Sequence, residues 1–157
     1  REKPDVAKLY ESKITIAEKL LQRWVREYPD AKLPVTFDKW YTLPDFCRFV
    51  DQTLGLPYVG TLKSDSEIQL KGGERRIDEF AEHLKQEHSE ALKARKEPVF
   101  KPISIRYKGK REKYYSYCAT HRIRNFGRQR LVINHTREDL SDEPFFLVSN
   151  RLYWQAP

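Results

Sequence analysis

The chain has 157 residues, of which 39% are hydrophobic, and its formal net charge is +7. This length suits one domain with a core of its own, and the composition excludes a membrane span, which needs roughly 20 consecutive apolar residues. Aromatic residues make up 13% of the chain, which argues against a disordered protein because such rings need a core to pack in. The positive charge is typical of proteins that bind polyanions, and equally of a merely soluble surface.

Residues 12–28 form the first predicted element, an amphipathic helix. Thr15 and Glu18 have the spacing of a capping box, and Pro29 ends the segment. The apolar residues recur at helical spacing, so we expect them to form one buried face. This expected face consists of Ile16, Ala17, Leu20, Leu21, Trp24 and Tyr28.

Two short apolar segments of high β propensity follow, with a predicted helix between them. Residues 34–38 (PVTFD) predict a buried strand that ends in a carboxylate, Asp38, and residues 57–62 (PYVGTL) predict a second strand. The helix spans residues 42–54 and begins at Thr42, a good N-cap residue. Because strands that alternate with helices usually lie parallel, this half of the chain predicts an α/β layer with parallel strands.

The second half of the chain changes its periodicity. Residues 74–97 predict a long amphipathic helix. Its expected buried face consists of Ile77, Phe80, Ala81, Leu84, Ala91 and Leu92. Beyond this helix the apolar residues alternate, and Gly109 and Gly127 mark turns. Residues 99–149 therefore predict a largely antiparallel, hairpin-rich β region, whose last strand lies at residues 144–148.

Asp38 is the side chain most suggestive of chemistry. A carboxylate at the carboxyl end of a buried parallel strand stands where α/β sheets place their sites. Carboxylate oxygens are also the ligands that Mg²⁺ prefers in proteins. The alternative is a structural carboxylate that caps the next helix or pairs with Lys39. Position alone leaves both interpretations open.

A basic segment, residues 101–130, is the second candidate site. It holds a single acid, Glu112, and ten cations, namely Lys101, Arg106, Lys108, Lys110, Arg111, Lys113, Arg122, Arg124, Arg128 and Arg130. Tyrosines are interleaved with them, and cations that hold phosphates beside rings that stack on bases are typical of nucleic-acid binding. The alternative is a solvated hairpin whose tyrosines fill the core. Crowding so many like charges is costly without an anionic partner, which favours nucleic acid.

The other motifs are weak. Cys118 and His121 have the C-x-x-H spacing of zinc ligands, but no second pair follows. The sequence holds no G-x-G-x-x-G, P-loop or H-E-x-x-H motif. Two cysteines do not make a disulfide framework, which favours a reducing cytosol. Because residue 1 is Arg and the sequence has no Met, we expect it to be a piece of a longer polypeptide.

Three segments together carry a family resemblance. Residues 35–41 (VTFDKWY) precede a predicted helix, residues 58–63 (YVGTLK) follow it, and residues 145–150 (FFLVSN) contain the last predicted strand. In this arrangement the chain resembles the middle of the DDE transposases of bacterial and archaeal insertion sequences, in particular those of the IS-four-like superfamily. The resemblance covers nearly the whole chain.

The resemblance implies three parts: a partial RNase H-like core at residues 1–67, an insertion with a helix and basic hairpins at residues 68–143, and a last core strand within residues 144–157. It also implies two Mg²⁺ or Mn²⁺ ions held by Asp, Asp and Glu, with Asp38 as the second carboxylate. The first Asp would precede residue 1, and the Glu, in a Y-x-x-R-x-x-x-E motif, would follow residue 157. This chain alone is therefore expected to be inactive.

The implied substrate is double-stranded DNA, both transposon ends and target, which the parent enzyme nicks and joins. The setting would be the prokaryotic cytoplasm, at the nucleoid, with a homodimer in the synaptic complex. The residues assigned to DNA contact are Lys63, Arg106, Lys108, Lys110, Arg111, Lys113, Arg122, Arg124, Arg128 and Arg130. Two alternatives of other classes stay open: a non-catalytic nucleic-acid-binding α+β module, and a plain α+β scaffold whose charge serves solubility.

Overall fold

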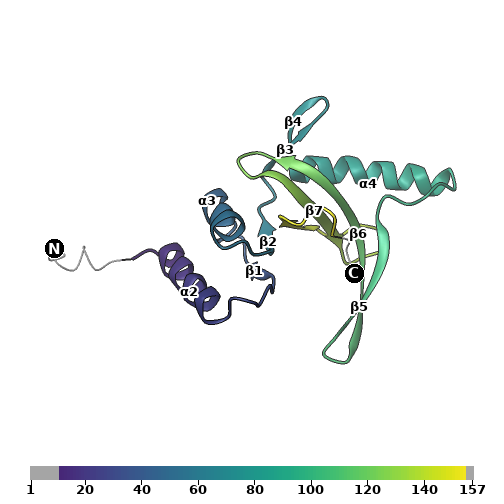
Figure 1. Cartoon of the computed structure of the whole chain (residues 1–157). Coiled ribbons are helices and arrows are strands. Elements are labelled where there is room, and N and C mark those ends of the chain that lie inside the picture. The colour runs from purple at the N-terminus through teal and green to yellow at the C-terminus, as the bar shows by residue number, and fades with distance from the viewer. Residues whose placement is uncertain (1–10, 155–157) are drawn as a thin grey trace, which may run out of the picture.

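The computed structural model describes residues 11–154 and shows a mixed α/β architecture around one eight-stranded sheet (Figure 1). The strand order is β1-β2-β8-β7-β6-β3-β4, and β5 pairs with the first half of β6. Along the chain the elements are α2 (Lys13–Glu27), β1 (Val35–Phe37), α3 (Pro44–Arg48), the π-helical turn η1 (Phe49–Thr53), β2 (Tyr58–Leu62), β3 (Glu67–Leu70), β4 (Gly73–Arg76), α4 (Ile77–Lys93), β5 (Lys101–Tyr107), β6 (Lys110–Ile123), β7 (Gly127–His135) and β8 (Phe145–Ser149).

The sheet is mostly antiparallel. β1 and β2 lie parallel, with Val35 opposite Tyr58 and Phe37 opposite Gly60. The other strand pairs among the described residues are antiparallel. The parallel pairing predicted for the strands at residues 34–38 and 57–62 is therefore confirmed. The other edge of β2 pairs in antiparallel fashion with β8, a strand from the far end of the chain. The antiparallel hairpins predicted for residues 99–149 are confirmed.

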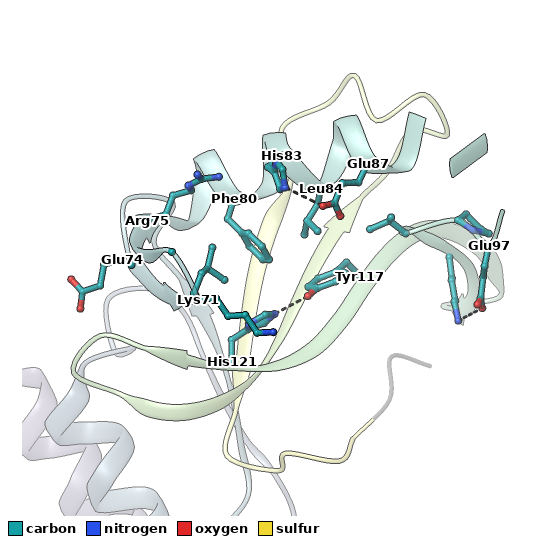
Figure 2. A pocket seen from close by; sticks show the side chains of 16 residues that line it. Lys71, Glu74, Arg75, Phe80, His83, Leu84, Glu87, Glu97, Tyr117 and His121 are labelled. Carbon is teal, nitrogen blue, oxygen red and sulfur yellow. Dashed lines mark hydrogen bonds and ion pairs between the residues drawn. The ribbon is translucent and has the colours of Figure 1, made fainter. Parts of the chain in front are cut away.

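The three α-helices of the described residues lie on one face of the sheet, which we call the helix face. α2, α3 and η1 cover β1 and β2 through a cluster around Tyr58. α4 covers β3, β6, β7 and β8 through a larger cluster, in which the rings of Phe80 and Tyr117 lie 6.0 Å apart (Figure 2). Phe126 packs against both clusters and so joins them. The other face of the sheet, the open face, carries no helix within residues 11–154.

The first helix differs from its prediction. It begins at Lys13, and the cap is the Ser12 hydroxyl, which accepts from the Thr15 N–H at 3.1 Å. Ile16 and Leu20, expected to be buried, are 44% and 62% exposed. Two apolar stripes run along this helix, and periodicity alone does not tell which of them meets the sheet. The stripe that packs consists of Ile14, Ala17, Leu21, Trp24 and Val25.

The other two helices also begin later than predicted. Leu43 is the N-cap residue of α3, and the predicted cap, Thr42, instead donates from its hydroxyl to the Asp38 carbonyl at 2.9 Å. α4 begins at Ile77 because the preceding residues pair with β3 as β4. In the last turns of α4 the buried face differs from the predicted one. Leu92, expected to be buried, is exposed, and His88 is buried instead.

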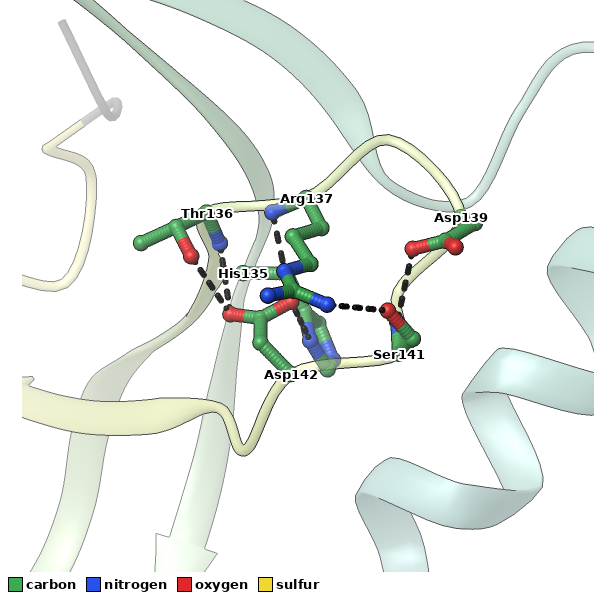
Figure 3. Close-up of polar contacts among 6 residues, drawn as sticks. All are labelled: His135, Thr136, Arg137, Asp139, Ser141 and Asp142. Atoms are coloured by element: carbon green, nitrogen blue, oxygen red, sulfur yellow. Dashed lines mark hydrogen bonds and ion pairs between the residues drawn. The ribbon is translucent and has the colours of Figure 1, made fainter.

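The loop between β7 and β8 is tied to the sheet by Asp142 (Figure 3). Its carboxylate accepts from the Thr136 N–H at 2.8 Å, the Thr136 hydroxyl at 2.9 Å and the Arg137 N–H at 3.2 Å. It also lies 3.2 Å from Nδ1 of the buried His135. Burial opposes ionisation of this carboxyl group, but the hydrogen bonds from Thr136 and Arg137 outweigh it and hold the pKa of Asp142 well below its usual range.

Replacing Asp142 by Asn should lower the free energy of unfolding at neutral pH by roughly 1.5–3 kcal/mol, the worth of a hydrogen bond to a charged group. Because folding lowers the pKa of Asp142, its stabilisation is present above the unfolded pKa of about 3.9 and is lost as the pH falls through the folded pKa. Urea unfolding in acid should therefore show a steeper loss for the wild type than for Asp142→Asn. Glu143→Gln, an exposed neighbour, should match the wild type. Identical acid profiles of wild type and Asp142→Asn would contradict this assignment.

Candidate functional site

Asp38 closes the turn at the end of β1. Its Oδ1 accepts from the Trp40 N–H at 2.9 Å, and its carbonyl accepts from the N–H groups of Tyr41 and Thr42 at 3.1 and 3.2 Å. A carboxylate that accepts from the backbone two residues on forms an Asx-turn, which fixes the direction of the chain. Asp38 thus has a structural role, but in this turn and not as the cap of α3.

Gly60 of β2 makes room for this turn. A Cβ at this position would lie 2.6 Å from Cε2 of Phe37 and 2.8 Å from Oγ1 of Thr42, so a side chain there would force its neighbours to move. The same Thr42 hydroxyl donates to the Asp38 carbonyl. Because Gly60 has no side chain, the turn can pack directly against β2, and this packing keeps Asp38 at the edge of the sheet.

Asp38 and Lys63 lie at the same edge of the sheet, because β1 and β2 are parallel and each residue directly follows its strand. Both residues are exposed. The position predicted for Asp38, directly after a strand that pairs in parallel, is therefore confirmed. The prediction that this strand is buried is wrong, because β1 lies at the edge of the described sheet and its residues are half-buried or exposed. A hollow of about 600 Å³ adjoins this edge, and its lining residues are Lys39, Trp40, Thr61, Leu62, Lys63, Ser64, Asp65, Arg76, Phe145 and Phe146.

The fit of a metal ion to this edge depends on the number of ligands present. The described residues hold no group of three or more His, Cys, Asp or Glu that could bind an ion. Asp38 offers one carboxylate, and one of its oxygens already accepts from the Trp40 N–H. Mg²⁺ in proteins is bound through one or two carboxylates together with waters and substrate phosphates. Within residues 11–154, Asp38 can therefore offer one carboxylate oxygen to an ion, and no group of three ligand residues surrounds it.

The β5–β6 hairpin carries the densest positive charge. It projects beyond the rest of the sheet (Figure 1), and Arg106 stands directly opposite Arg111 across the two strands. The acid of this region, Glu112, accepts from the Tyr114 hydroxyl at 2.6 Å. The exposed cations of this hairpin, which we name the hairpin patch, are Arg106, Lys108, Lys110, Arg111 and Lys113.

Four more of the predicted arginines lie at the far end of β6 and on β7. Arg122 and Arg128 are exposed and stand directly opposite each other. Arg124 forms ion pairs with the glutamates of β3 and β4 at 2.5 and 3.6 Å. Nε of Arg130 donates to the backbone carbonyl of Trp154 at 2.7 Å. Arg124 and Arg130 therefore have partners within the fold, which their positions in the sequence did not reveal.

The structure divides the predicted basic segment into two separate patches. Side chains along a strand point alternately to its two faces, so Arg111 and Lys113 share the helix face with Tyr115, whereas Arg122 and Arg128 point to the open face. Along β6, Arg111 and Arg122 are up to about 36 Å apart at 3.3 Å per residue. A single continuous basic surface over residues 101–130 does not form.

Each patch contains arginines that face each other, Arg106 with Arg111 and Arg122 with Arg128. Like charges directly opposite on paired strands are destabilising. None of the ion pairs among the described residues includes any of these four arginines, so no neighbouring carboxylate offsets the repulsion. A bound polyanion would turn this repulsion into attraction, so the arrangement can hold phosphates at two places.

A larger pocket that the sequence patterns did not indicate lies between α4, the β3–β4 hairpin and β6 (Figure 2). Its volume is about 880 Å³. Within it, Nε2 of His83 lies 3.0 Å from Glu87, and the Tyr117 hydroxyl lies 2.7 Å from Nε2 of His121. Burial is the main cause that lowers the pKa of His121. The alternation of a strand places Tyr117 and His121 on one face but Cys118 on the other, so the C-x-x-H spacing makes no zinc site.

Comparisons of the chain with protein-family models, with curated proteins and with solved structures found no match. Within the part of the chain that the structure describes, no helix is both long and apolar enough to cross a membrane. The candidate function therefore rests on the geometry of the Asp38 edge and of the two basic patches.

Two arginines near the end of β6 provide a matched test of the repulsion. Arg122→Gln removes half of a like-charge pair and should raise the free energy of unfolding by roughly 0.2–1 kcal/mol, with a smaller gain at high salt because ions screen the repulsion. Arg124→Gln removes an attraction to the glutamates of β3 and β4 and should lower the free energy of unfolding. Urea unfolding at low and high salt measures both effects. A loss of stability in Arg122→Gln would contradict the repulsion.

Proposed function

We propose that this chain is part of a DDE-type DNA transposase, which cuts and joins transposon ends by phosphoryl transfer, and that Asp38 is the second of its three catalytic carboxylates. The observation that carries the proposal is Asp38 itself, an exposed carboxylate directly after a strand of a parallel pair. Strand ends of this kind are rigid mounts for reacting groups. Lys63 follows the neighbouring strand at the same edge, where a cation can contact a DNA phosphate.

The surroundings of Asp38 support an RNase H-like arrangement. β1 and β2 lie parallel with α3 between them in the chain. β1 is at the edge of the described sheet, so its other backbone edge is open to a further strand. In the proposed core that strand would carry the first Asp. Residues 68–143 would then be the insertion, from which β8 returns to pair with β2.

When bound, Mg²⁺ or Mn²⁺ would stabilise the charge on the attacking and leaving oxygens of the DNA phosphate. Asp38 would supply one ligand, and the proposal places the other two carboxylates outside residues 11–154, in line with the lack of a three-ligand group within these residues. The Trp40 N–H orients the Asp38 carboxylate and leaves its second oxygen without a hydrogen bond among the described residues. The chain's own contributions are thus one rigidly held carboxylate and the cations that hold DNA.

The hairpin patch supports contact with double-stranded DNA. Its five exposed cations stand on a hairpin that projects from the sheet, and an Arg–Arg pair lies at its centre. Phosphates attract such a cluster, and each contact releases counterions from the duplex. A homodimer in the synaptic complex and a place at the nucleoid belong to the same proposal.

A second candidate function is a non-catalytic nucleic-acid-binding α+β module. The observation that favours it is the pair of opposed arginines in each patch. These pairs need a polyanion but do not need Asp38. The two candidates therefore agree on DNA binding and differ in what the carboxylate of Asp38 does.

The first prediction from this proposal concerns DNA binding by the hairpin patch. Changing Arg106, Arg111 and Lys113 together to Ser should weaken binding to a DNA duplex and reduce the slope of log K against log salt by roughly 2–3, about 0.9 for each lost phosphate contact. A variant with Lys13, Arg23 and Arg26 changed to Ser loses the same charge from α2 and should keep the slope. Fluorescence anisotropy over a salt series measures both. Equal slopes for the two variants would exclude the hairpin as the DNA contact.

The second prediction separates the two candidate functions. Asn at position 38 can still accept from the Trp40 N–H, so Asp38→Asn removes the charge and keeps the turn. In the polypeptide that also carries the other two carboxylates, this variant should bind transposon-end DNA as the wild type does and lose Mg²⁺-dependent strand cleavage. Asp45→Asn, which removes an exposed carboxylate of α3, should cleave normally. Cleavage by Asp38→Asn at the wild-type rate would leave only the binding module.

A further inference from the structure

The indole of Trp40 is unusually exposed. Its relative exposure is 72%, although Trp is on average highly buried. None of the aromatic pairs among the described residues includes it. On a flexible loop an exposed Trp would be weak evidence for a binding site, but a hydrogen bond to Asp38 fixes the backbone of Trp40.

The turn that carries Trp40 is fixed on both sides. The Trp40 N–H donates to the Asp38 carboxylate at 2.9 Å, and the next N–H, that of Tyr41, donates to the Asp38 carbonyl at 3.1 Å. The Tyr41 ring packs against Phe46 of α3 at 5.9 Å between ring centroids. The structure therefore presents an apolar ring to solvent from a rigid base, which lowers the entropy cost of binding a ligand to it.

Trp40 stands at the hollow of about 600 Å³ beside the ends of β1 and β2. This volume lies within the usual range for small-molecule sites, about 300–1,000 Å³. The cations that line the hollow are Lys39, Lys63 and Arg76, against one acid, Asp65. Arg76 already bonds to a carboxylate of α4 at 2.8 Å, whereas none of the described ion pairs includes either lysine.

The combination of an exposed ring and cations fits a nucleotide whose base is free. A base can stack on an indole, and a lysine can hold the adjoining phosphate. A paired base inside a duplex cannot offer its face in this way, because its neighbours in the strand already cover it. The cations of the hollow favour a polyanion, and its exposed aromatic ring favours a single strand over a duplex.

We propose that Trp40, with Lys39 and Lys63, binds an unpaired nucleotide of single-stranded DNA in the hollow beside Asp38. The inference rests on the proposed function for the identity of the polymer as DNA. It goes beyond that function because holding a duplex through the hairpin patch requires no unpaired base and no role for Trp40. The two surfaces are distinct, since the hollow lies at the ends of β1 and β2 and the hairpin patch lies on β5 and β6.

The test compares Trp40→Ala with Trp40→Phe and with Trp154→Ala as a matched control. Trp154 is also exposed, at 41%, but lines a different groove. With labelled oligothymidylate, Trp40→Ala should weaken binding roughly 5- to 150-fold, the loss of one stacked base. Trp40→Phe should recover part of the loss, and Trp154→Ala should bind as the wild type does. Binding to a blunt duplex should be the same in all four proteins.

Two further measurements test the chemistry of the contact. Lys63→Ala should reduce the salt slope for oligothymidylate by about 0.7, the value for one contact to a single strand. An oligonucleotide containing 2-aminopurine should lose fluorescence on binding the wild type and keep it on binding Trp40→Ala, because stacking quenches this base. Competition by polyglutamate should require a much higher charge concentration than competition by oligothymidylate, because polyglutamate has no base to stack.

The outcomes separate this inference from the proposed function. Unchanged oligothymidylate binding by Trp40→Ala, with duplex binding still dependent on the hairpin patch, would overturn the inference alone. An equal loss on single strand and duplex, or equally effective competition by polyglutamate, would also overturn it, because the hollow would then be a general site for anions. Absence of binding to both forms of DNA would overturn the inference and the proposed function together.

Discussion

The pairing of β2 with β8 is the contact on which the arrangement of the molecule depends. It joins the parallel pair that carries Asp38 to the antiparallel strands that carry the arginines, and so makes one sheet of two distant parts of the chain. Asn150, directly after β8, secures this junction: its side chain accepts from the Tyr58 N–H at 2.9 Å and donates to the Leu56 carbonyl at 3.0 Å. Without this junction, the Asp38 edge would have no fixed position relative to the basic patches.

The single-sided coverage of the sheet explains why the basic residues separate. Residues that face the helices fill the core, as Leu131 and Ile133 do, while their neighbours along the same strand must face the open side. The last described residues cross the open face. The Leu152 carbonyl accepts from the Thr120 hydroxyl at 2.7 Å, and the Trp154 carbonyl accepts from Nε of Arg130. Arg130 thus serves the backbone of its own chain, and the arginines that remain exposed stand at the ends of the long strands.

Features set by neighbouring residues could be predicted from the sequence, whereas features set by distant contacts could not. The strand that ends before Asp38 and the alternation after residue 98 depend on local patterns, and the structure has both. The buried stripe of α2 depends on what it meets, so Ile16 and Leu20 were placed wrongly. The same holds for Arg124, whose glutamate partners lie on β3 and β4. No pattern in the sequence indicated that Trp40 is exposed, because an aromatic residue that follows a strand can equally well be buried in a core.

One turn links the two activities proposed for this edge of the sheet. The Asp38 carboxylate that would bind a metal ion is the group that holds the Trp40 backbone, so the reacting phosphate and a stacked base would be placed by the same few atoms. The link is geometric and does not depend on charge, since an amide oxygen can accept the same hydrogen bond. Displacement of the turn, for instance by a side chain at Gly60, would move both groups together. Loss of the charge at Asp38 would remove the chemistry and leave the nucleotide contact in place.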